Sequence, residues 1–167
     1  MIYTKTITEA FGGSAANPTH RDMYVTTGLI YQFELYFPPG SSGLVGVAVL
    51  DGGYQVWPSE PGEWFFGDNA LISFPDRYFI SSPRKALIIA SYNLDDTYAH
   101  LFQIRIGQVS TELFISSFLP GVGMDKMADT IAAALAGQEA EKIAQRDTLV
   151  SYFSGGGTVQ SAAGESK

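Results

Sequence analysis

Short runs of alternating apolar and polar residues fill the middle of the chain, residues 22–119, and turn residues separate them. The clearest run, residues 98–106, places Phe102, Ile104 and Ile106 on one side. Alternation with a period of two residues predicts a strand with one buried face. About eight such runs at intervals of roughly 8–14 residues predict a mainly β fold. We expect a two-sheet antiparallel sandwich with jelly-roll-like connectivity.

Individual runs indicate different positions in the sandwich. Residues 44–50 are continuously apolar, which predicts a central strand buried on both faces. Pro75 and Asp76 separate two further runs, so we predict a strand on each side of them. The predicted strands occupy residues 23–37 (one bent strand or a pair), 44–50, 54–57, 70–74, 78–80, 86–92, 98–106 and 111–119.

The N-terminal residues 1–21 differ in sequence pattern from the predicted sandwich domain, residues 22–119. A short alternating run, residues 4–8, precedes a loop rich in Gly, Ser, Ala and Asn. We predict an extended N-terminal arm here, with Ile7 as a candidate contact to a partner.

A helical pattern follows the β-rich domain, within a segment predicted to span residues 120–153. Its apolar residues are spaced for one helix face, which either packs on the chain's own sandwich or binds a partner. We favour a partner because the sandwich has enough β-sequence to close its own core. The predicted partner-binding residues of the helix are Met127, Ile131, Leu135, Ile143 and Val150. The last segment, residues 154–167, is rich in Gly, Ser and Ala and is predicted to be a disordered tail.

Composition and charge narrow the classes of partner. The chain is 46% hydrophobic and 16% charged, a low charge density that is typical of proteins in contact with neighbours. A net charge of −7, with no Lys/Arg cluster, argues against nucleic acid and anionic membranes. No apolar run reaches the length of a membrane span. The first residues lack the apolar core of a signal peptide, so we expect synthesis in a cytoplasm.

The loop between residues 51 and 68 is the richest candidate ligand site. It combines aromatic and acidic side chains, and we name Tyr54, Trp57, Glu63, Trp64 and Asp68 as the candidate ligand loop. Exposed Trp and Tyr beside acids would stack on a glycan, and the carboxylates would suit Ca²⁺. The loop lacks the Asp-x-Asp-x-Asp-Gly spacing of a calcium loop. The alternative is that both Trp side chains anchor the loop to the core or to a neighbouring subunit.

The other residues that could take part in catalysis do not form an enzyme's motif. Asp95 and Asp96 are adjacent, which favours a turn over a catalytic dyad, because neighbouring side chains in a strand face opposite ways. His20 and His100 lack metal-binding spacing, and the chain has no Cys. Neither a Gly-x-Ser-x-Gly elbow nor a phosphate-binding loop is present. We therefore predict no catalytic residues, no metal and no cofactor.

Several short motifs carry a resemblance to a known class of protein. These are GLIYQFELYFPPG (residues 28–40), GLVGVAVLDGGYQVWP (43–58), PGEWFFGDN (61–69) and YNLDDTY (92–98). Together they resemble small β-sandwich structural proteins of tailed phages and prophages. The resemblance implies a capsid decoration (cement) or accessory protein, and it carries over no catalytic residue.

The sequence thus leads to one main expectation and two alternatives. We expect a virion structural protein that binds other copies of itself and a capsid or other particle protein through its arm, helix and tail. A carbohydrate- or receptor-binding sandwich that uses Trp57 and Trp64 is the first alternative. A carboxylate-based hydrolase is the second, and no pair of acids at a suitable spacing supports it.

Overall fold

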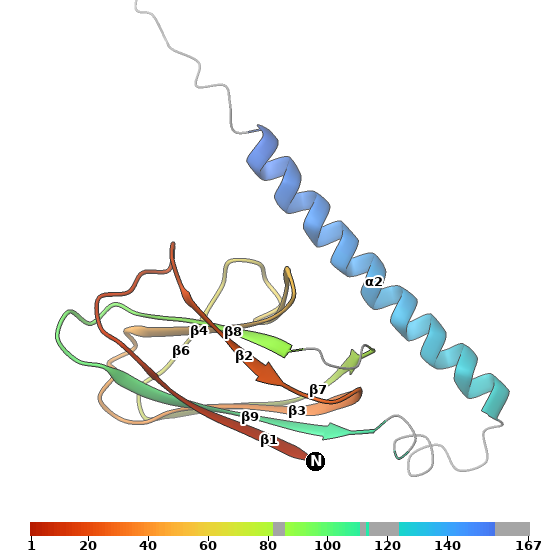
Figure 1. Cartoon of the computed structure of the whole chain (residues 1–167), viewed down its shortest axis with the longest axis horizontal. Coiled ribbons are helices and arrows are strands. Elements are labelled where there is room, and N and C mark those ends of the chain that lie inside the picture. Colours follow the sequence, from red (N-terminus) through yellow and green to blue (C-terminus); the bar gives the residue numbers. More distant parts are fainter. Residues whose placement is uncertain (82–85, 111–112, 114–123, 156–167) are drawn as a thin grey trace, which may run out of the picture.

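The computed structural model describes residues 1–81, 86–110, 113 and 124–155. Two antiparallel sheets pack face to face, and one long helix runs beside them (Figure 1). This arrangement confirms the predicted two-sheet sandwich with a C-terminal helix. Within these residues, no helix is long and apolar enough to cross a membrane.

Each sheet has strands from distant parts of the chain. The first sheet has the order β1-β9-β3-β7, and the second has the order β2-β8-β4-β5, with β6 paired to β4. In this order, consecutive strands lie in opposite sheets except along β4–β6, which is the connectivity of a jelly roll. The strands are β1 (Ile2–Glu9), β2 (Thr19–Tyr24), β3 (Gly28–Phe37), β4 (Val45–Asp51), β5 (Tyr54–Trp57), β6 (Phe65–Phe66), β7 (Ala70–Ile80), β8 (Ala86–Asn93) and β9 (His100–Val109).

The core lies between the two sheets and consists of alternate residues of each strand. Phe33, Phe102 and Ile104 are fully buried there, as the alternation predicts. Strand β4 is also covered on its outer side, where a Cβ added to Gly46 would lie 2.4 Å from the Tyr92 ring. Trp64 packs edge-on against the same ring, with 4.8 Å between ring centroids. This outer aromatic cover explains why residues 44–50 are continuously apolar.

The predicted N-terminal arm is wrong. Strand β1 pairs with β9 along its whole length, and β2 pairs with β8, so both lie within the sandwich. Ile7, predicted to contact a partner, is 4% exposed and belongs to the core. The buried Glu9 accepts hydrogen bonds from Thr19 Oγ1 at 2.9 Å, from Arg21 and from Ser91. These bonds tie β1 to β2 and β8.

Strand β7 is a second difference from the sequence prediction. The two predicted strands are one strand that runs through Pro75 and Asp76. A proline is tolerated here because β7 is the edge of its sheet. The predicted strand 111–119 falls outside the described residues, apart from residue 113, as does the tail from residue 156.

The predicted helix is confirmed as α2, Met124–Gly155. Its described half-buried positions follow a helical period of three, four and three residues: Leu135, Gln138, Lys142 and Gln145. Ile143 and Val150 are 50% and 59% exposed, so they do not share this face. A helix turns by about 100° per residue, so Ile143 and Val150 lie about 80° and 60° around the helix from Leu135, on the side away from Lys142 and Gln145. Their predicted role as partner contacts stays a prediction. The side chains of Met127 and Ile131 lie outside the described part.

Candidate functional site

The helix meets the sandwich at a polar site formed by the ends of β4, β5 and β7. Asp51, the last residue of β4, has a side chain that is 1% exposed. It accepts hydrogen bonds from the Tyr78 hydroxyl at 2.7 Å and from Lys142 Nζ of α2 at 2.7 Å. Loss of either partner would leave a buried charge uncompensated, so the Asp51–Lys142 pair favours this register of the helix on the sandwich.

Two further hydrogen bonds flank this ion pair. The backbone N–H of Gln55 donates to Gln145 Oε1 at 3.0 Å, and the Tyr54 hydroxyl donates to Glu141 at 3.5 Å. We refer to Asp51, Tyr54, Gln55 and Tyr78 as the Asp51 site. The contacts of Asp51, Tyr54 and Gln55 to α2 each join polar atoms.

The electrostatics keep both phenols of the Asp51 site protonated. Burial, and then the hydrogen bond to Asp51, holds the pKa of Tyr78 far above its usual range. Burial and the nearby Glu141 carboxylate raise the pKa of Tyr54. Both hydroxyls therefore remain donors to carboxylates at neutral pH, and Lys142 supplies the positive charge. Its Nζ also lies 5.7 Å from the centre of the Tyr78 ring.

The contact between α2 and the sandwich is loosely packed. A cavity of about 180 Å³ has Tyr54, Asp76 and Gln138 in its lining. A second cavity of about 230 Å³ is lined by Tyr54, Lys142 and other residues. Each is larger than the space that one water molecule needs. Among the side chains of α2 that the structure describes, Glu141, Lys142 and Gln145 bond to the sandwich through polar atoms.

The predicted ligand loop is mostly structural. Trp57 is 2% exposed, and its ring lies 4.8 Å from that of Phe33 in the core. Its indole N–H donates to Asp76. Trp57 is therefore not available for stacking on a glycan, and that prediction is wrong. Trp64 is half-buried against Tyr92. The alternative, that both Trp side chains anchor the loop, is what the structure shows for the chain itself.

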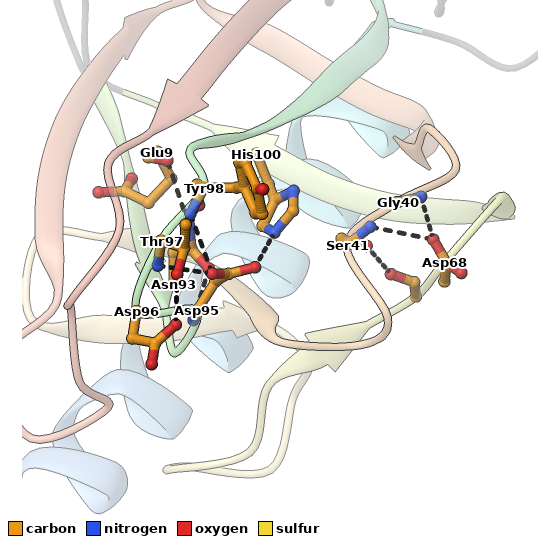
Figure 2. Close-up of polar contacts among 11 residues, drawn as sticks. Glu9, Gly40, Ser41, Asp68, Asn93, Asp95, Asp96, Thr97, Tyr98 and His100 are labelled. Atoms are coloured by element: carbon orange, nitrogen blue, oxygen red, sulfur yellow. Dashed lines mark hydrogen bonds and ion pairs between the residues drawn. The ribbon is translucent and has the colours of Figure 1, made fainter.

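The remaining residues of the predicted loop lie in different surroundings. Tyr54 contacts α2, and Glu63 is exposed. Asp68 accepts hydrogen bonds from the backbone N–H groups of Gly40 (2.6 Å) and Ser41 (3.1 Å), so it closes the turn after β3 (Figure 2). Across the described ranges, no three His, Asp or Glu side chains gather in a way that would hold a metal ion.

Asp95 organises the turn between β8 and β9, as Figure 2 shows. Its carboxylate accepts hydrogen bonds from the backbone N–H groups of Thr97 (2.8 Å) and Tyr98 (2.9 Å) and lies 2.9 Å from His100 Nε2. Asp96 instead contacts the Thr97 hydroxyl. The two adjacent acids have separate turn contacts, which agrees with the turn predicted from their spacing.

We expect Asp95→Asn to make the fold less sensitive to acid. The backbone hydrogen bonds from Tyr98 and Thr97, and then His100, lower the pKa of Asp95. A lowered pKa in the folded state adds stability above the unfolded value, near 4, and this stability is lost as the pH falls through the folded value. Thermal melts between pH 7 and pH 2 should show a lower melting temperature for the variant at pH 7 and a smaller loss below pH 4. Asp96→Asn is the matched control, and equal acid profiles for both variants would contradict this expectation.

The Asp51 site is not among the sites predicted from the sequence, although the chain carries a signal for it. On one helical face, Leu135 is followed by three polar residues at helical spacing: Gln138, Lys142 and Gln145. A polar segment on the face that meets the sandwich indicates a polar partner surface. No protein-family model, curated protein or solved structure matches the chain. Function is therefore inferred from the contacts and exposed surfaces of the chain itself.

Proposed function

We propose that the chain is a structural protein of a virion, a capsid decoration or accessory protein, and that α2 binds neighbouring subunits. The observation that supports this most is the length of α2. Its 32 residues extend for about 48 Å, whereas the half-buried positions among its described side chains, from Leu135 to Gln145, span about 15 Å. Figure 1 shows the C-terminal end of the helix extending past the sandwich.

The roles of the acidic residues favour a non-catalytic function. Glu9, Asp51, Asp68 and Asp95 each accept hydrogen bonds that join strands, turns or the helix. Acids used in this way stabilise a rigid scaffold. The resemblance to phage β-sandwich proteins supports a virus particle as the structure to which the chain binds.

The exposed side of α2 offers contacts to a neighbour. Val150 is 59% exposed, in the part of α2 that follows Gln145, and residues 132–134 are exposed alanines that permit close approach of another element. A carbohydrate- or receptor-binding module is less well supported, because Trp57, one of its two predicted stacking tryptophans, is in the core.

Incorporation into particles tests this proposal. We expect full-length chain to band with virions purified from a producing host in a density gradient. Val150→Asp should lower its abundance in the band about tenfold or more, since it places a charge in an apolar contact worth roughly 1.5–3 kcal/mol. Quantitative mass spectrometry of the band measures this.

The matched control is Leu71→Asp, at a similarly exposed apolar position of β7. It should be incorporated like the unaltered chain if α2 makes the contact. Absence of the full-length chain from particles would refute the virion role. Equal incorporation of both variants would refute the role of α2.

A further inference from the structure

We propose that one end of the sandwich, formed by the β1–β2 loop and the β8–β9 turn, binds a protein of the particle through an apolar surface flanked by Lys or Arg. Phe11, Leu94 and Tyr98 are exposed at this end, and we call them the tip patch. Figure 1 shows both connections at the end of the sandwich opposite to the N-terminus and to the start of α2. This inference rests on the proposed function and adds a second contact to that of α2.

The tip patch consists of large side chains from two connections that are bonded to each other. Phe11, Leu94 and Tyr98 are 57%, 52% and 68% exposed. The Gly12 N–H donates to the Asp95 carbonyl at 2.7 Å, and the Tyr98 N–H donates to the Asp95 carboxylate at 2.9 Å. Phe11 and Leu94 are the chain neighbours of Gly12 and Asp95. Single exposed apolar residues are common on protein surfaces, whereas a group of them marks a contact site.

A buried amide joins the two connections. Asn93 is fully buried, and its Nδ2 donates to the backbone carbonyls of Tyr98 at 2.8 Å and of Glu9 at 3.4 Å (Figure 2). Its Oδ1 accepts from the Asp95 N–H at 3.0 Å, and its backbone carbonyl accepts from the Gly13 N–H at 2.8 Å. Because these bonds hold both connections in one conformation, a partner that binds here meets a preorganised surface and loses less conformational entropy.

The charge around the tip patch is acidic. Asp95 and Asp96 lie within the β8–β9 turn, where Asp95 is bonded to His100 and Asp96 is exposed. Neither Lys nor Arg occurs in residues 6–20 or 86–104, which contain both connections. Opposite charges across an interface favour binding, and like charges oppose it. An apolar patch with an acidic rim therefore fits a partner surface with an apolar centre and a basic rim.

Another protein is a better occupant of the tip patch than a second copy of the chain. The tip of a second copy has the same acidic charge, so two tips repel each other. Four cations of the chain are already paired with its own acids: Arg21 with Glu9, Arg105 with Glu34, Lys142 with Asp51 and Arg146 with Asp147. The partner must supply its own Lys or Arg, and a particle protein is the partner that the proposed function provides.

Binding to particles that lack the chain tests this inference. Such particles, purified from a producing host without the gene for the chain, are mixed with full-length chain, and bound chain is measured after sedimentation. Tyr98→Ala should lower the affinity about tenfold or more, because it removes an aromatic contact. Alanine keeps the backbone groups that bond to Asp95 and Asn93. Tyr24→Ala is the matched control, since Tyr24 is 70% exposed at the end of β2 away from the tip and should bind as wild type does.

Charge reversal tests the chemistry of the partner surface. Asp96→Lys should lower the affinity about tenfold or more, because it places a cation against a basic rim. Glu60→Lys changes the net charge equally at an exposed acid of another loop, and it should bind as wild type does. Added salt should weaken the binding of wild type more than that of Asp96→Lys. Unchanged affinity of Asp96→Lys would overturn the basic rim.

The outcomes separate this inference from the proposed function. Wild type that does not bind particles would refute both. Equal binding of wild type and Tyr98→Ala would overturn the tip contact and leave the virion role intact. Sedimentation of the chain with phosphatidylcholine vesicles, or dimers in native mass spectrometry that Tyr98→Ala abolishes, would identify a membrane or a second copy as the occupant and overturn the particle protein.

Discussion

Replacing Trp57 with alanine should lower the free energy of unfolding by about 3–5 kcal/mol, the range for removing a large buried aromatic side chain. The indole is 2% exposed and packs between Phe33, at 4.8 Å, and Tyr78, at 5.8 Å between ring centroids. Its N–H also donates to Asp76, which would lose this partner. Urea denaturation followed by circular dichroism measures the change.

The matched control is Trp64→Ala, in the same predicted ligand loop. Trp64 is half-buried and contacts Tyr92 edge-on, so we expect a loss of about 1–2 kcal/mol. Equal losses for the two variants would contradict the placement of Trp57 in the core. Trp57→Phe separates packing from hydrogen bonding, because it keeps a ring and removes the N–H.

Arg21→Met should destabilise the fold by about 2–4 kcal/mol, because it leaves the buried Glu9 carboxylate without its cation. Glu9 is 4% exposed, and Arg21 is the positive group against it. The Arg21 side chain is 29% exposed, so water reaches the pair and keeps the loss below that of a fully buried ion pair. Chemical denaturation at pH 7 measures the effect.

A double-mutant cycle controls this experiment. Glu9→Gln removes the carboxylate, so Arg21→Met should cost less in that background than in wild type. Lys5→Met is a second control, since Lys5 donates to the backbone carbonyl of Asp22 and faces no buried acid there. An equal cost of Arg21→Met in both backgrounds would show that the ion pair is not the cause.

The sequence predicts the strands whose apolar residues alternate or run without a break. Residues 98–106 and 44–50 have clear patterns, and β9 and β4 lie there. The alternating run at residues 4–8 is visible in the sequence, but the place of β1 inside the sandwich is not, because two of its inward positions, Lys5 and Glu9, are polar. They are accommodated by partners on β2 and β8 that are distant in the sequence, and no local pattern reveals such partners.

The site was harder to predict than the fold. Asp51 follows a strand and precedes two glycines, so in sequence it resembles a solvated turn residue. Its burial depends on Tyr78 and on Lys142, which is 91 residues away. Trp57 looked available for a ligand because it stands between polar residues and a proline. Its position in the core depends on how β5 pairs with β4.

The two tryptophans lie in separate surroundings, Trp57 between the sheets and Trp64 over the outer side of β4. They are the two tryptophans of the whole chain. Their fluorescence therefore reports on two different regions without any added label. In a Trp64→Phe chain, the emission follows the interior alone. In a Trp57→Phe chain, it follows the loop that covers Tyr92, so an optical measurement distinguishes loosening of the surface from loss of the core.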